Sequence, residues 1–92
     1  MILRLDFCNK NVTFDSAMYS ALKNQNNVFI RRSSWKKSIF IHAKKSSDDE
    51  TMIEIVTISE NCDLHRLYAW NTQISIDDAL ANNWEIYKAI LG

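Results

Sequence analysis

Apolar residues in the first quarter of the chain recur at spacings of three and four. Five residues show this pattern: Phe14, Ala17, Met18, Ala21 and Leu22. Such spacing is typical of an amphipathic helix with one buried face. Thr13 stands where an N-cap is expected, and the Asn-rich run 24–27 indicates the end, because Asn tolerates the left-handed conformation of a C-cap. The pattern therefore predicts a helix between Thr13 and this run.

Other segments alternate between apolar and polar residues or are rich in β-branched side chains, as strands are. Residues 2–7 alternate with a period of two, and the polar run 9–11 is expected to end this strand. Four later runs are predicted strands: 28–32, 39–43, 51–59 and 64–70. The run 51–59 is apolar on both faces, which predicts a central strand, and the polar run 44–50 before it predicts a hairpin loop.

A short helix is predicted near the C-terminus, after an amide-rich loop. Ser75 is the expected N-cap, and Asp77 and Asp78 follow in the first turn, where the helix dipole favours negative charge. One face of this helix would carry four apolar residues: Ile76, Ala79, Leu80 and Trp84. We expect that face to pack against the core. Residues 84–90 then fit either a strand or a continued helix.

These elements predict an α+β fold. It has one long N-terminal amphipathic helix packed on an antiparallel sheet, with a short helix before the last strand. The 92 residues suffice for a single domain with one modest core.

Charge and composition disfavour several classes of function. Eleven basic residues balance eleven acidic ones, whereas proteins that bind DNA or RNA usually carry a basic excess. No apolar run approaches the roughly 18 residues of a membrane span, and Arg4 and Asp6 interrupt any signal-peptide core. We therefore expect a cytoplasmic protein with no nucleic-acid or membrane partner.

Cysteines and histidines form no recognisable site pattern. Cys8 and Cys62 lack a C-x-x-C spacing, and we interpret both as small buried residues of a reducing compartment. His42 and His65 stand far apart in the sequence. We therefore expect no metal site and no cofactor.

The strongest candidate chemistry lies between the predicted strands 28–32 and 39–43. Residues 31–37, Arg-Arg-Ser-Ser-Trp-Lys-Lys, place four cations around Trp35. Arginine matches phosphate geometry and a Trp face stacks on a base, but a solvated turn with Trp35 in the core explains the same residues. Asp77 and Asp78 are interpreted as partners of the helix dipole rather than an acid–base pair. Trp70 and Trp84 fit either core or stacking positions.

Four pieces of sequence, in order, resemble those of a small phage family: Phe14-x-x-Ala17-x-x-x-Ala21-Leu22, Val28-x-x-Arg31-Arg32-x-x-Trp35, Trp70, and Ser75-x-x-Asp78-x-Leu80-Ala81-x-x-Trp84-Glu85. The family is the second Thoeris anti-defence family. The resemblance covers most of the chain. It implies a family-like core over residues 13–88 of one domain, 1–92, with residues 1–12 as an N-terminal extension.

The resemblance implies a non-enzymatic sponge in the cytoplasm of an infected bacterial host. Such proteins form oligomers, tetramers among them, and hold cyclic ADP-ribose-type signals, or in some relatives cyclic dinucleotides, without cleaving them. Carried over to this chain, Trp35 would stack on a base or ribose, and Arg32, with Arg31 beside it, would contact phosphate. Asp78 would accept from ribose or base donors, and Asn71 would add a polar contact.

Two other classes of function are weighed against this one. The alternative is a protein-binding inhibitor that docks on a host defence effector, which would present exposed apolar surface. A small hydrolase is disfavoured, because the sequence contains no coherent set of nucleophile, base and metal ligands.

We predict a homo-oligomer, expected to be a tetramer, that associates through the first helix or a sheet face. A small core and zero net charge leave little to oppose self-association. Light scattering at micromolar concentration checks this, and a monomer mass near 10.7 kDa would rule it out.

Overall fold

The computed structural model describes residues 2–24, 27–45, 51–66 and 74–92. Within these ranges the elements follow in this order: β1 (Ile2–Val12), α1 (Phe14–Lys23), β2 (Val28–Arg32), β3 (Ile39–Lys45), β4 (Thr51–Ile58), β5 (Leu64–Arg66), α2 (Ile76–Leu80) and β6 (Trp84–Leu91). The strands form one antiparallel sheet in the order β1-β6-β2-β3-β4-β5. No helix in these ranges is long and apolar enough to span a membrane.

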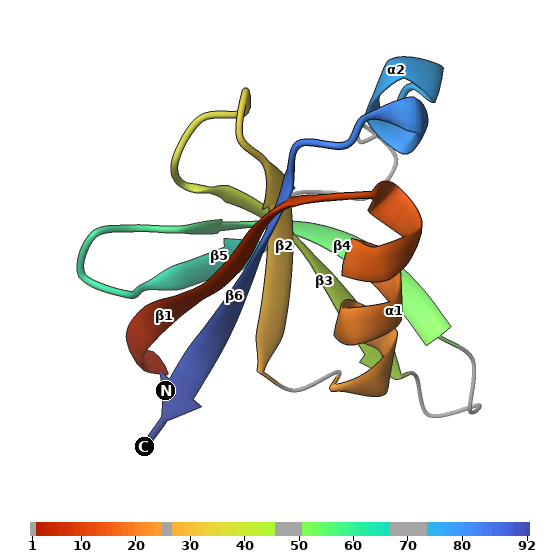
Figure 1. Ribbon diagram of the computed structural model, residues 1–92. Coiled ribbons are helices and arrows are strands. Elements are labelled where there is room, and N and C mark those ends of the chain that lie inside the picture. Colours follow the sequence, from red (N-terminus) through yellow and green to blue (C-terminus); the bar gives the residue numbers. More distant parts are fainter. Residues whose placement is uncertain (1, 25–26, 46–50, 67–73) are drawn as a thin grey trace.

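Figure 1 shows α1 against one face of the sheet and α2 beyond one end of it, next to the start of β6. We call the face under α1 the helical face and the opposite one the open face. Ile30 and Trp84 belong to the buried cluster of the helical face, and Phe29 and Phe40 to that of the open face. Consecutive residues of β2 alternate between the two clusters, so this strand is buried from both sides.

The first helix forms as predicted. The Thr13 hydroxyl accepts from the backbone N–H of Ser16 at 3.3 Å, and Ala17 and Ala21, on the inner side of α1, are fully buried. The expected left-handed cap does not occur at Asn24, whose φ is −126°. Residues 25 and 26 of the same run lie outside the described ranges.

The predicted arrangement with the helix at the N-terminus is wrong, because β1 precedes α1. β1 pairs with β6, so that residues 2–12 form one edge of the sheet. The expected break at residues 9–11 does not end this strand. Register shifts after Phe7 and after Asn9, with a positive φ of 55° at Asn11, accommodate the irregular run within the pairing.

The remaining strands lie close to their predicted positions. β3 extends to residue 45, so the first two residues of the predicted loop 44–50 belong to a strand, and residues 46–50 lie outside the described ranges. β4 has neighbours on both sides, as predicted. β5 covers residues 64–66 of the predicted strand 64–70; the rest, with Trp70, is not described. Residues 84–91 form a strand, which decides between the two alternatives for that segment.

Helix α2 begins as predicted but does not pack as predicted. The Ser75 hydroxyl accepts from the Asp78 N–H, and the Asp78 carboxylate accepts from the Ser75 N–H, which together form a capping box. Ile76 and Leu80 are 78% and 80% exposed, and no residue of α2 is buried. The expected packed face of this helix is therefore wrong, since Trp84 enters the core from β6 instead.

The interpretation of both cysteines as buried is also wrong. Cys8 is exposed on β1, an edge strand. Cys62 is half-buried in the turn between β4 and β5, where its φ is 61°. The exposure of each cysteine depends on where its segment lies in the sheet, at an edge or in a turn, and the local sequence pattern does not show this.

Trp84 is the largest fully buried side chain among the described residues, and its indole N–H donates to the Asp78 carbonyl at 2.9 Å. We predict that Trp84→Ala lowers the free energy of unfolding by about 3–5 kcal/mol, because it leaves a large cavity. Leu80→Ala, on exposed α2, should change it by less than about 0.5 kcal/mol. Urea denaturation measures both. An equally large loss for Leu80→Ala would contradict the exposed position of α2.

Candidate functional site

Two neighbouring arginines of β2 point to opposite faces of the sheet. Side chains alternate along a strand, so Arg31 shares the open face with Phe29, and Arg32 shares the helical face with Ile30. The sheet therefore separates two cations that the sequence places side by side.

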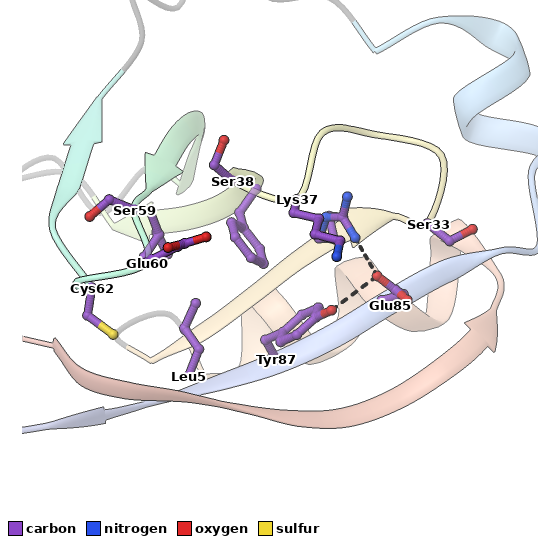
Figure 2. A pocket seen from close by; sticks show the side chains of 12 residues that line it. Leu5, Ser33, Lys37, Ser38, Ser59, Glu60, Cys62, Glu85 and Tyr87 are labelled. Carbon is purple, nitrogen blue, oxygen red and sulfur yellow. Dashed lines mark hydrogen bonds and ion pairs between the residues drawn. The ribbon is translucent and has the colours of Figure 1, made fainter.

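Arg31 is buried on the open face, with 5% of its surface exposed, and its charge is matched there. Its Nη1 donates to Glu85 Oε1 at 2.7 Å, and its Nη2 donates to the backbone carbonyl of Trp35. The Tyr87 hydroxyl donates to the same Glu85 oxygen at 3.2 Å (Figure 2). Burial, with the Glu85 carboxylate adding to it, raises the pKa of Tyr87 above 10.0, so this hydroxyl stays protonated as a donor.

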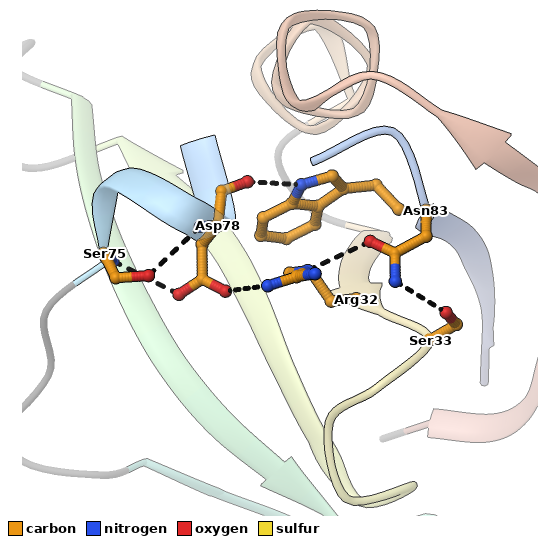
Figure 3. Close-up of polar contacts among 6 residues, drawn as sticks. Arg32, Ser33, Ser75, Asp78 and Asn83 are labelled. Carbon is orange, nitrogen blue, oxygen red and sulfur yellow. Dashed lines mark hydrogen bonds and ion pairs between the residues drawn. The ribbon is translucent and has the colours of Figure 1, made fainter. Parts of the chain in front are cut away.

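Arg32 joins β2 to α2 and to the start of β6. Its Nη1 donates to Asp78 Oδ1 at 2.7 Å, and its Nε donates to Asn83 Oδ1 at 3.0 Å. Asn83 Nδ2 in turn donates to Ser33 Oγ at 3.0 Å (Figure 3). Arg32 and Asp78, which were predicted to contact different groups of a ligand, are thus paired with each other.

The Asp78 carboxyl is held in its charged form. Burial alone raises its pKa, but the hydrogen bonds from Arg32 and from Ser75 outweigh burial, and the net effect lowers the pKa below 3.8. At neutral pH the carboxylate therefore binds both Arg32 and the first turn of α2.

Trp35 lies in the β2–β3 loop, residues 33–38, which is fixed from both faces. The Trp35 ring stands edge-on to Trp84, with centroids 5.2 Å apart and an interplanar angle of 72°. It packs against the helical-face cluster, while its carbonyl accepts from Arg31 on the open face. The backbone N–H of Ser33 donates to the Asn83 carbonyl at 3.0 Å. Two opposed sets of contacts thus position this loop.

A groove of about 850 Å³ lies on the open face beside this loop. Its described lining is Leu5, Arg31, Ser33, Lys37, Ser38, Phe40, Ile58, Ser59, Glu60, Cys62, Glu85 and Tyr87. Figure 2 shows Leu5 between Cys62 and Tyr87, and Lys37 on the side of Glu85.

The groove combines an apolar floor with a polar rim. Leu5, Phe40 and Ile58 supply the floor, and the Tyr87 ring stands edge-on to Phe40 with centroids 5.2 Å apart. Lys37 is exposed on the rim, and among the described residues no carboxylate lies within ion-pair distance of its ammonium group. The exposed Glu60 also lines the groove, on the side away from Lys37 (Figure 2). Such a site suits an amphipathic ligand whose flat part lies on the floor and whose anionic group lies at the Lys37 end.

The five predicted ligand contacts do not gather at this groove. Arg31 lines it, whereas Arg32 and Asp78 lie in the network on the helical side and Trp35 packs beside that network. Asn71 lies outside the described residues.

Sequence reasoning missed Phe40, Glu85 and Tyr87 as groove residues. Glu85 and Tyr87 belong to the segment that the sequence left open between strand and helix. Only a strand in register with β2, with Glu85 opposite Arg31, brings them to the open face. The alternation of Glu85 and Tyr87 is the one signal that points to a shared face.

A family model described as the Thoeris anti-defense 2-like domain (Tad2-like) matches residues 12–87. The chain belongs to this family. The resemblance seen in the sequence is confirmed, and membership supports a phage anti-defence role. No curated protein and no solved structure shows a match to the chain.

The Tad2-like match contains the β2–β3 loop, Lys37 and the segment from Glu85 to Tyr87, but of β1 it contains only Val12. The groove residue Leu5 therefore lies outside the matched region.

The Tad2-like chain, in the part that the structure describes, has no group of three or more His, Cys, Asp or Glu side chains placed to hold a metal ion. His42 instead pairs across the strands with Glu54, with Nδ1 and Oε1 2.9 Å apart.

We predict that Asp78→Asn lowers the free energy of unfolding by about 1–2 kcal/mol at neutral pH, because it weakens the capping box and the Arg32 pair. Asp77→Asn is the matched control, since Asp77 is exposed in the same turn, and it should cost no more than about 0.5 kcal/mol.

The effect of Asp78→Asn should depend on pH. Because the folded-state pKa of Asp78 is lowered, its stabilisation is fully present above pH 3.8 and is lost as the pH falls through the folded-state value. The gap between wild type and Asp78→Asn should thus shrink on acidification below pH 3.8. Denaturant titrations across this range measure it, and a constant gap would contradict the assignment.

Proposed function

We propose that this Tad2-like protein sequesters a cyclic nucleotide immune signal of the cyclic ADP-ribose type, and releases it unchanged. The groove on the open face carries this proposal, because it joins an apolar aromatic floor to an exposed cation on the rim. Family membership supports the anti-defence context, and we propose that the protein acts in the cytoplasm of an infected bacterial host.

The chemistry of the groove matches the parts of such a ligand. Its volume of about 850 Å³ lies within the range of small-molecule sites, roughly 300–1,000 Å³. The half-buried Tyr87 ring offers an apolar surface for a base, backed by Phe40, which is only 3% exposed. Ser38 offers a hydroxyl for ribose, and the Ser33 hydroxyl, which accepts from Asn83, can still donate to a ligand. Lys37 offers the charge that a phosphate requires.

Arg31 acts in this proposal mainly by holding the groove in shape. Its charge is already matched by Glu85, and its Nη2 fixes the Trp35 carbonyl. Arg32 and Asp78 fix the same loop from the helical side. We therefore propose that Arg31, Arg32 and Asp78 do not touch the ligand and instead position the β2–β3 loop, which carries Lys37.

We propose binding rather than catalysis, because Glu85, the more buried of the two carboxylates that line the groove, is occupied, and the other, Glu60, is exposed. Glu85 Oε1 accepts from both Arg31 and Tyr87, which leaves it poorly placed to remove a proton from water or from a hydroxyl. We also propose a homo-oligomer, because a small core and zero net charge leave little to oppose self-association.

A protein-binding inhibitor that docks on a host effector is the second candidate. The exposure of Ile76 and Leu80 on α2 favours it, since these two residues lie one turn apart on a helix and present apolar surface to solvent.

We predict that the protein, incubated with cyclic ADP-ribose and passed through a filter that retains protein, depletes free ligand, and that heating returns the ligand chemically intact. Lys37→Ala should weaken binding about tenfold, because it removes one charge-assisted contact. Lys36→Ala is the matched control: it makes the same change in net charge in the same loop, outside the groove lining.

Three results would contradict this prediction. Linear products that scale with protein would indicate an enzyme. Equal effects of the two lysine variants would place the ligand elsewhere. An absence of ligand depletion, together with tight capture of a host effector that Leu80→Ala weakens, would favour the inhibitor.

A further inference from the structure

β1 forms one edge of the sheet and is paired on one side only. Among the described strands its single neighbour is β6, so the backbone N–H and C=O groups on its other side are available to a further strand. The register of β1 against β6 is unbroken from Arg4 to Phe7. This edge lies outside the matched region, which contains only Val12 of β1.

The exposed side chains of this edge combine charge with apolar surface. Arg4 Nε donates to Asp6 Oδ1 at 3.0 Å, and 68% and 44% of the two side-chain surfaces are exposed. An ion pair at this exposure contributes little to the stability of one chain. Leu3 and Phe7, which flank the pair, are 58% and 52% exposed. The edge therefore carries both charges and apolar side chains that a neighbouring strand can cover.

Charged residues on an edge strand usually prevent pairing between edges, but the order of residues 3–7, Leu-Arg-Leu-Asp-Phe, is complementary to itself. When two copies of this strand run antiparallel about a two-fold axis through Leu5, Arg4 of each copy lies opposite Asp6 of the other. Leu3 of each copy then lies opposite Phe7 of the other. Opposite charges and apolar residues thus meet in the same register, and both kinds of pair stabilise a sheet.

Neighbouring registers lose this match. An axis through Arg4 sets two arginines opposite each other, and an axis through Asp6 sets two aspartates opposite each other. Like charges directly opposite destabilise a strand pair. An axis between two residues, on either side of Leu5, sets Leu5 opposite Arg4 or Asp6, so that a charge faces an apolar side chain. Among these registers, only the one centred on Leu5 matches both charge and hydrophobicity.

We propose that β1 pairs edge to edge with β1 of a second copy of the chain, in the register centred on Leu5, so that two sheets become one. The inference rests on the homo-oligomer of the proposed function, to which it gives a defined contact, and it does not depend on which ligand is bound. Arg4 and Asp6 then form ion pairs between copies, and backbone hydrogen bonds along the edge add affinity. Directly opposite residues share a face, so the open faces of both copies lie on the same side of the joined sheet.

Charge reversal tests the register, with self-association measured by sedimentation velocity at micromolar concentration. Arg4→Asp makes both members of each opposed pair negative, and Asp6→Arg makes both positive. Each variant alone should therefore associate roughly tenfold more weakly than wild type. An equimolar mixture of the two variants should associate as wild type does, because every opposed pair between unlike chains then has opposite charges. Lys10→Glu is the matched control, since it reverses an exposed charge on the same strand beyond the paired segment and should leave association unchanged.

The mixture separates the contact between copies from the Arg4–Asp6 bond within one strand, because neither variant can form that bond. Unchanged association in both single variants, a loss that mixing does not restore, or an equal loss in Lys10→Glu would overturn the inference. A wild-type protein that stays monomeric would overturn both the inference and the proposed homo-oligomer. Capture of cyclic ADP-ribose is measured on the same samples: its absence, with association that follows the charge pattern, would contradict the proposed sequestration and support the strand pairing.

Discussion

The ion pair between Arg31 and Glu85 is the interaction on which the groove depends. Both side chains are largely buried, with 6% and 17% of their surfaces exposed. Burying two charges costs as much as their attraction returns unless further hydrogen bonds are made, so such a pair is weak support for stability alone. Here the further bonds go to the Trp35 carbonyl and the Tyr87 hydroxyl. The pair therefore serves to position the loop above the groove and the ring beside it.

A second ion pair, on the other face of the same strand, has a similar effect. Arg32 binds Asp78 and Asn83, and Asn83 binds Ser33 at the start of the β2–β3 loop. The loop is thus fixed from the open face by one arginine and from the helical face by the next. In the sequence the adjacent arginines suggest a phosphate-binding site, but in the fold each one forms an ion pair that positions the β2–β3 loop, one from each face of the sheet.

The limits of the sequence prediction follow from this geometry. Helix α1, its Thr13 cap and the Ser75 cap depend on neighbours within four residues, so local pattern was enough to find them. The partners of Arg31 and Arg32 lie about fifty positions away, at Glu85 and Asp78, and are set by the register of β6 against β2. The spacing of apolar residues along the chain does not show which residue of β6 lies opposite which residue of β2. For the same reason Ile76 and Leu80 were expected in the core: their helical spacing is right, but the chain turns into β6 before that face can pack.

The place of β6 in the sheet also has a consequence for biosynthesis. β6 lies between β1 and β2, so among the described strands β1, which is made before the others, pairs only with β6, which is made after them. During translation α1 and the hairpin of β3 and β4 contain mostly local contacts and can form early, whereas β1 must wait. Until β6 emerges from the ribosome, Leu5 and Phe7 remain unpaired and exposed to other nascent chains or chaperones. Closure of the groove is therefore a late event of folding, coupled to completion of the sheet.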